Sequence, residues 1–101
     1  MRAWRFHEAG DIANLRLEET PAPEPRVGEV LVRVEAAALN PADRYLVQGQ
    51  YPRAGAPPFT PGRDGAGVVE RPCAGGRFRE GDRVVLLGGL TGISEQGMLA
   101  E

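Results

Sequence analysis

The sequence has 101 residues, of which 42% are hydrophobic and 26% are charged, and its formal net charge is −2. This length suits one domain with a modest core, and this composition is typical of a folded globular protein rather than a disordered one. Every basic residue is Arg, and because these are scattered along a slightly acidic chain, a nucleic-acid surface is excluded as its main function.

The first third of the chain predicts strands joined by turns. Met1–His7 carries apolar residues at alternate positions through part of its length, and Leu15–Glu19 alternates again. Pro21–Pro25 predicts a stiff extended connector, because proline lacks a ladder donor and restrains the residue before it. The clearest strand is Val30–Ala38, and we expect it to be half-buried. Its apolar face would carry Val30, Val32, Val34 and Ala36, opposite Arg33 and Glu35.

A short helix follows this strand, and its boundaries have strong local signals. Asn40 is a good N-cap, because its side-chain oxygen can accept from an amide of the first turn. Pro41 suits the first helical position, and the Asp43 carboxylate can reach back to the cap amide. Gly49 can end the helix in a left-handed conformation. A short helix held in this way between a strand and a loop is a typical place for functional residues.

The rest of the chain predicts more short strands. Gln50–Thr60 contains three prolines and should be an irregular surface loop. Gly65 and Gly67 precede Val68–Val69, which indicates a strand that another backbone or a ligand approaches closely. Arg83–Leu87 predicts a further strand. The expected fold is therefore mainly β with one short helix, arranged as a partly open barrel.

Several motifs occur in an order that resembles a known family. They are Gly28–Val32, Asn40–Asp43 with Tyr45, Gly49 and Tyr51–Pro52, Pro61–Glu70, Gly81–Val85 and Gly97–Glu101. In this order they resemble the N-terminal, GroES-like domain of the medium-chain dehydrogenase/reductases, and most closely the zinc-independent quinone oxidoreductases of the zeta-crystallin type. The resemblance covers nearly all of residues 1–101 and implies a catalytic and substrate-binding domain.

The end of the chain suggests that the protein continues. Met98–Glu101 reads as the beginning of a strand, and a severed strand leaves its ladder partners unmet. Members of the family continue into a Rossmann domain, and no G-x-G-x-x-G fingerprint after a strand occurs in residues 1–101. We therefore expect most of the dinucleotide site, and the homodimer contacts that the family forms, to lie outside this sequence.

The resemblance also implies that no catalytic zinc is bound. Zinc-dependent relatives hold the metal with a Cys at the Asn40 position and a His at the Arg63 position, followed by an acidic residue that corresponds to Asp64. Here an amide and a guanidinium occupy these positions, and Arg has no lone pair to offer a cation. Cys73 and His7 lack partner spacing and are expected to be structural. One Cys also excludes an internal disulfide, and no apolar run approaches the ~20 residues of a membrane span, so we expect a cytoplasmic protein without a membrane partner.

Three residues are implied as catalytic, namely Asn40, Tyr45 and Tyr51. In the family, the residues at these positions lie beside the nicotinamide ring and line the substrate cleft. Each also has a structural interpretation, with Asn40 as a helix cap and the tyrosines as half-buried packing residues. Asn40 and Tyr45 are further expected to contact the cofactor.

Arg63 is the third expected cofactor contact, and it has two interpretations. It could pair with Asp64 or Glu70, or it could point at an anionic part of the cofactor or substrate. The structural ion pair is the favoured prediction from the residues alone.

The implied reaction is hydride transfer from NADPH to a quinone or another electron-poor carbonyl such as an enone, without a metal. The cofactor carries the difficult chemistry, while this domain positions the acceptor and excludes water. The alternatives are a stand-alone binding module and a co-chaperonin-like barrel. The second predicts a long mobile apolar loop, which the Pro-rich Gln50–Thr60 segment matches poorly.

Overall fold

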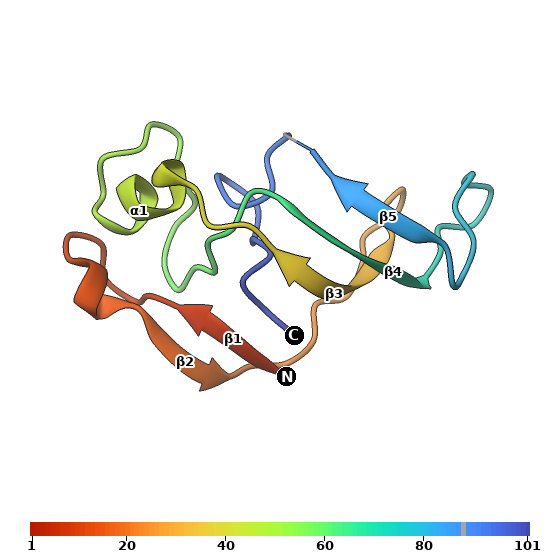
Figure 1. Cartoon of the computed structure of the whole chain (residues 1–101), viewed down its shortest axis with the longest axis horizontal. Coiled ribbons are helices and arrows are strands. Elements are labelled where there is room, and N and C mark those ends of the chain that lie inside the picture. The colour runs from red at the N-terminus through yellow and green to blue at the C-terminus, as the bar shows by residue number, and fades with distance from the viewer. Residues whose placement is uncertain (88) are drawn as a thin grey trace.

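A computed structural model describes residues 1–87 and 89–101 of the chain. Its elements are mostly short strands with one α-helix, and they are shown in Figure 1. In chain order they are β1 (Arg2–Arg5), the 3-10 helix η1 (Ile12–Asn14), β2 (Arg16–Glu19), β3 (Leu31–Ala37), α1 (Pro41–Val47), β4 (Gly65–Arg71) and β5 (Arg83–Leu86). The predicted fold class, mainly β with one short helix, is confirmed.

The strands form two separate antiparallel sheets, so the barrel is open rather than closed. β1 pairs with β2, and β4 lies between β3 and β5 in a three-stranded sheet. Ala37 stands opposite Gly65 at one end of the β3–β4 ladder, and Gly67 stands opposite Val84 in β5. A Cβ on Gly67 would lie 2.9 Å from the main-chain carbon of Arg33. The predicted close approach at this glycine is therefore real, and the approaching backbone is β3.

The predicted apolar face of β3 is only partly correct. Val32 and Val34 are half-buried and Arg33 and Glu35 are exposed, as expected. Ala36, however, is exposed, because the register between β3 and β4 shifts between Val34 and Ala36. Such an irregularity breaks the two-residue period of side chains along a strand. The alternation in sequence could not show this shift.

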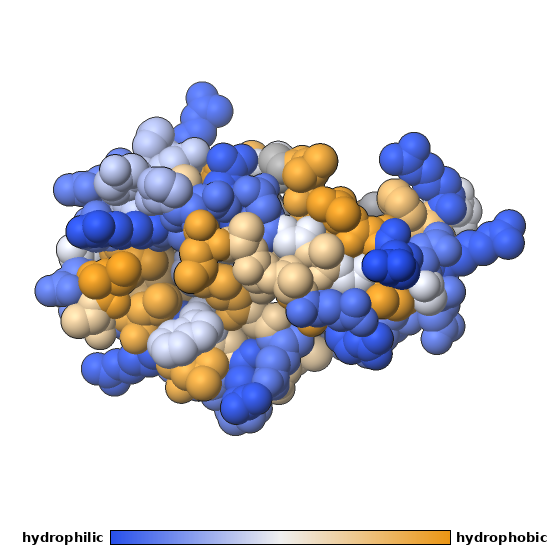
Figure 2. Space-filling view, viewed as in Figure 1, coloured by the Kyte–Doolittle hydropathy of each residue, from blue (hydrophilic) through white to orange (hydrophobic). Residues whose placement is uncertain are grey.

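The densest core lies where α1 meets the start of the chain. Phe6, Leu46, Val47 and Phe59 are almost fully buried, and Leu15 and Tyr51 pack against them. The rings of Phe6 and Phe59 are tilted by 56° with centroids 6.1 Å apart, within the range of favourable aromatic pairs. Figure 2 shows further apolar side chains gathered across the middle of the visible face. The core thus anchors α1 against β1 and the loop before β4.

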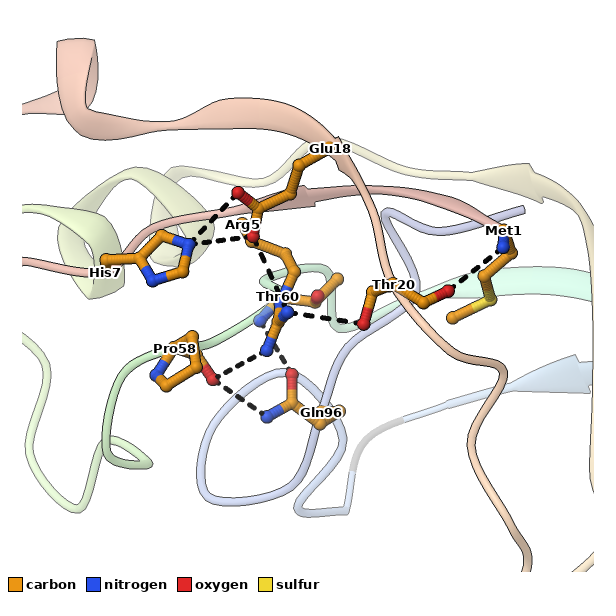
Figure 3. A network of polar contacts seen from close by, with 8 residues as sticks. All are labelled: Met1, Arg5, His7, Glu18, Thr20, Pro58, Thr60 and Gln96. Atoms are coloured by element: carbon orange, nitrogen blue, oxygen red, sulfur yellow. Dashed lines mark hydrogen bonds and ion pairs between the residues drawn. The ribbon is translucent and has the colours of Figure 1, made fainter.

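A polar network connects the β1–β2 sheet to two loops (Figure 3). The Arg5 guanidinium donates to Thr20 Oγ1 at 3.3 Å and to the Pro58 carbonyl at 3.5 Å, and it pairs with Glu18 at 3.5 Å. Gln96 then joins the two loops. Its Nε2 donates to the Pro58 carbonyl at 3.3 Å, and its Oε1 accepts from the Thr60 N–H at 2.8 Å. This network holds the chain in place just before Pro61.

The last residues return to β1, next to the start of the chain. The Trp4 N–H donates to the Leu99 carbonyl at 2.8 Å, and the Glu101 N–H donates to the Arg2 carbonyl at 2.9 Å. Ala3 and Ala100 form an isolated antiparallel bridge. Residues 98–101, which were predicted to begin a strand, thus lie as a short extended strip alongside β1. No helix of the described residues has the length and apolar character needed to span a membrane.

Candidate active site at the junction of Asn40 and Asp64

The start of α1 follows the predicted capping pattern, with one difference. Asn40 is in an extended conformation, and its N–H donates to Asp43 Oδ2 at 2.9 Å. The Asp43 N–H in turn donates to the main-chain carbonyl of Asn40 at 3.0 Å. The Asn40 side-chain oxygen faces this turn as in a capping box, but no hydrogen bond of good geometry joins it to the helix. At the other end Gly49 has φ +76°, as predicted for a left-handed terminator.

The Asn40 side chain is instead tied to Asp64, the residue just before β4. Its Nδ2 donates to Asp64 Oδ2 at 2.9 Å, although the two residues are far apart in sequence. The Ala38 N–H also donates to the Asp64 carbonyl at 2.9 Å, which extends the β3–β4 ladder by one step. The site is therefore positioned where β3 ends and β4 begins. The sequence motifs contained both residues, but only the strand pairing shows that they touch.

Arg63 does not form the predicted structural ion pair. Among the described residues no ion pair joins it to Asp64 or Glu70. Asp64 accepts from Asn40 instead, and the guanidinium extends toward Gly89. Arg63 Nη2 donates to the Gly89 carbonyl at 3.3 Å. Its Nε is buried without a hydrogen-bond partner in the described part of the chain. A buried donor of this kind costs free energy unless a partner meets it. Because Arg63 forms no ion pair with Asp64 or Glu70, the favoured sequence interpretation is wrong for this residue.

The two tyrosines occupy different surroundings. Tyr45 lies on α1 with 48% of its surface exposed, so it is free to meet a ligand or a covering segment. Tyr51 is half-buried and packs against the core cluster described above. The structure brings Asn40 and Asp64 into contact, and among the described residues no side-chain hydrogen bond joins either of them to Tyr45 or Tyr51. The catalytic role of Tyr45 and Tyr51 remains a prediction.

Next to the junction, residues 61–62 cross residues 97–99 at very close range. The Met98 N–H donates to the Gly62 carbonyl at 2.9 Å, and the Leu99 N–H donates to the Pro61 carbonyl at 3.0 Å. Gly62 has φ +112°, and a Cβ there would lie 2.8 Å from the Leu99 nitrogen. Only glycine combines this conformation with this separation. The crossing holds the segment that carries Arg63 and Asp64.

Metal ligands do not gather in the described residues. No group of three His, Cys, Asp or Glu side chains that could hold an ion occurs in residues 1–87 and 89–101. His7 Nε2 lies 2.8 Å from Glu18 Oε1 on the β1–β2 sheet, and Cys73 Sγ contacts the Ala74 carbonyl. The structural role expected for both residues stays a prediction.

One groove in the described structure lies away from this junction. It has a volume of about 940 Å³ and runs between the proline-rich connector, β3 and the segment 90–97. None of the predicted site residues lines it. Sequence reasoning did not find this groove, because the segments that form it are far apart along the chain.

Comparison with known proteins gives a consistent result. A family model described as "Alcohol dehydrogenase GroES-like domain" matches residues 26–100. The chain is 38% identical over 94 residues to "Quinone oxidoreductase" of Rattus norvegicus, covering 91% of this chain and 29% of the relative. It is also 38% identical over 107 residues to "NADPH-dependent alkenal/one oxidoreductase, chloroplastic" of Arabidopsis thaliana, covering 100% of this chain and 28% of the relative.

Solved structures agree with these relatives. A thermostable alcohol dehydrogenase from Pyrobaculum aerophilum superposes with a TM-score of 0.89 at 36% identity, covering 100% of this chain and 37% of that one. Escherichia coli quinone oxidoreductase complexed with NADPH superposes with a TM-score of 0.77 at 30% identity, covering 84% and 26%. The chain thus spans between 26% and 37% of the length of these four proteins.

Proposed function

Because this chain belongs to the alcohol dehydrogenase GroES-like domain family of the medium-chain dehydrogenase/reductases, we propose that it is the acceptor-binding domain of an NADPH-dependent quinone or enone reductase that uses no zinc. Relatives named quinone oxidoreductase and alkenal/one oxidoreductase support the substrate class. A relative named as NADPH-dependent and a structural neighbour complexed with NADPH support the cofactor.

The observation that carries this proposal is the pairing of Asn40 with Asp64. In zinc-dependent relatives the corresponding region supplies a thiolate and an imidazole, whereas here it supplies an amide and the Arg63 guanidinium. The Asn40 nitrogen is engaged with Asp64 Oδ2 at 2.9 Å, and a guanidinium cannot ligate a cation. The residues at this junction therefore do not fit a catalytic zinc, although alcohol dehydrogenases occur among the structural neighbours.

The same residues fit the nicotinamide end of NADPH. Arg63 keeps a buried Nε–H that no atom of the described residues meets, and Asn40 keeps a second amide N–H besides the one given to Asp64. When bound, NADPH supplies the hydride. On this proposal Asn40, Tyr45 and Arg63 contact the cofactor, while the phenols of Tyr45 and Tyr51 orient the acceptor carbonyl by stacking or hydrogen bonding. A quinone or enone is electron-poor enough to need no metal to polarise it.

The remainder of the dinucleotide site belongs to polypeptide beyond these residues in this proposal. The chain spans 29% of the rat relative, and large apolar side chains lie exposed on its surface. Several of them are more than half exposed, namely Val27, Leu39, Val85, Leu87 and Leu90. Exposed apolar surface of this kind is suited to contact with a further domain. A Rossmann domain, a homodimer through it and a cytoplasmic location complete the proposal.

The test uses the full-length protein and measures NADPH oxidation with 1,4-benzoquinone and with a simple enone, alongside elemental analysis for zinc. We expect turnover with at least one of these acceptors and no stoichiometric zinc. Oxidation of a simple alcohol with a dinucleotide is the comparison reaction, and we expect it to be negligible. One tightly held zinc per chain, or alcohol oxidation that exceeds quinone reduction, would show that the proposal is wrong.

A further inference from the structure

Two carboxylates hold Asn40 at two different points. The Asn40 main-chain N–H donates to Asp43 Oδ2 and the side-chain Nδ2 donates to Asp64 Oδ2, each at 2.9 Å. Asp43 is almost fully buried, and Asp64 is partly buried. Hydrogen bonds to ionised acceptors are stronger than those between neutral groups. The residue is therefore restrained in both its backbone and its side chain.

The charge on Asp64 decides which way the Asn40 amide faces. An amide has an acceptor oxygen and a donor nitrogen of nearly equal shape, so either atom could occupy the position beside Asp64. An ionised carboxylate only accepts hydrogen bonds, and so only the nitrogen is stable there. The carbonyl oxygen and the second N–H of Asn40 then face away from Asp64 in one arrangement.

Asp64 is itself well placed to impose this orientation. Its main-chain carbonyl accepts from the Ala38 N–H at 2.9 Å, next to the Ala37–Gly65 pair that ends the β3–β4 ladder. On its other side, the crossing at Gly62 fixes the segment that leads into it. Within the described residues, no Arg or His side chain forms an ion pair with Asp64. Its carboxylate is thus available to the Asn40 amide.

We propose that Asp64 is a positioning residue, whose carboxylate fixes the Asn40 side-chain amide with its nitrogen toward strand β4. A ligand beside Asn40 then always meets the same carbonyl oxygen and the same remaining N–H. This inference rests on the proposed function, because it takes Asn40 as a residue that contacts the cofactor and acceptor. It assigns to Asp64 a role that acts through Asn40 rather than through contact with substrate.

The test compares four full-length proteins: the parent, Asn40→Asp, Asp64→Asn and the double variant that exchanges the two residues. Asn40→Asp places two carboxylates beside each other and should lower the melting temperature. Asp64→Asn keeps a hydrogen bond but no longer selects one atom of the Asn40 amide, so its melting temperature should change little. The double variant restores a carboxylate–amide pair in the reverse order, and its melting temperature should recover most of the loss seen in Asn40→Asp.

Turnover of NADPH with 1,4-benzoquinone should follow a different pattern from stability. We expect Asp64→Asn to lower kcat by roughly two- to tenfold, because the Asn40 amide can now rotate and exchange the positions of its oxygen and nitrogen. The double variant should regain stability but not kcat, since a carboxylate now stands at position 40. Glu70→Gln removes a charge from an exposed position of β4 and is the matched control, with kcat and melting temperature expected at parent values.

Three results would overturn the positioning role. The first is an unchanged kcat in Asp64→Asn. The second is a set of melting-temperature shifts that simply add in the double variant, which would mean that the two side chains are not coupled. The third is recovery of kcat together with stability in the double variant, which would make the pair purely structural. A parent protein that turns over no NADPH with benzoquinone would instead contradict the proposed function, and the melting temperatures would still decide whether Asp64 holds Asn40.

Discussion

Replacing Gly62 with Ala should destabilise the protein far more than the same replacement at another left-handed glycine. Gly62 has φ +112°, and a Cβ there would lie 2.8 Å from the Leu99 nitrogen and 2.9 Å from the Met98 nitrogen. The unfavourable φ alone costs about 1–2 kcal/mol for a residue with a Cβ. Because both neighbouring atoms are backbone, they cannot move aside as a flexible side chain would.

The size of the effect follows from the hydrogen bonds at this crossing. Moving the 97–99 segment away would stretch the bonds from Met98 N–H to the Gly62 carbonyl and from Leu99 N–H to the Pro61 carbonyl, now 2.9 and 3.0 Å. Each is worth about 1 kcal/mol. With the backbone strain, the expected loss is about 3–4 kcal/mol, a large part of the roughly 5–15 kcal/mol that keeps a domain folded.

Gly75→Ala is the matched control for Gly62→Ala. Gly75 also has a positive φ of +76°, but nothing lies within 4 Å of a Cβ built on it. This variant should therefore lose only the conformational part, about 1–2 kcal/mol. Scanning calorimetry of the full-length parent and both variants measures the difference in melting temperature. If Gly62→Ala lowers the melting temperature no more than Gly75→Ala does, the crossing does not constrain the site as argued.

Three further predictions test other parts of the chain. The Arg26 side chain donates hydrogen bonds to Glu29 and lowers the pKa of the Glu29 carboxyl. This pair therefore stabilises the fold at pH values above the ordinary Glu pKa of about 4.3. The stabilisation is lost as the pH falls through the folded-state pKa. Glu29→Gln should accordingly lower the melting temperature slightly at neutral pH, and this deficit should shrink as the pH falls below the ordinary pKa of Glu. A deficit that stays the same at acidic pH would contradict the pairing. Tyr51→Phe should leave the melting temperature near the parent value, since the ring keeps its packing on the core. Turnover of the full-length protein should fall, but by less than the loss of about tenfold or more that we expect for Asn40→Asp. The 101-residue chain by itself should oxidise no NADPH with benzoquinone above the uncatalysed rate, because α1, with seven residues, is the only α-helix in the described parts and follows no phosphate-binding glycine loop. Measurable turnover by that chain would require a cofactor site within these residues.

Local signals in the sequence predicted local structure well. The N-cap at Asn40, the proline at the first helical position and the glycine at 49 placed α1 within one residue of its observed ends. Val30–Ala38 was likewise predicted almost as β3 is observed. These features depend on neighbours a few residues away, which a sequence displays directly.

Contacts between distant segments could not be predicted in the same way. The partner of the Asn40 side chain is Asp64, and this pairing left Arg63 without the ion pair that its neighbours in sequence suggested. The register shift in β3 exposed Ala36, although the alternation of residues continued through it. Each of these outcomes depends on how β3 and β4 align, and sequence spacing alone does not fix that alignment.

The strip formed by residues 98–101 has a consequence for the order in which the protein is made. Trp4 donates to the Leu99 carbonyl, and the Arg2 carbonyl accepts from the Glu101 N–H, so one edge of β1 pairs with residues that the ribosome adds nearly a hundred positions later. Until those residues are synthesised, this edge of β1 has no segment to pair with and can pair with other chains. Synthesis that stalls before Met98 would leave both that edge and the crossing at Gly62 unformed. The nascent chain is therefore most open to pairing with other chains before residues 98–101 are in place.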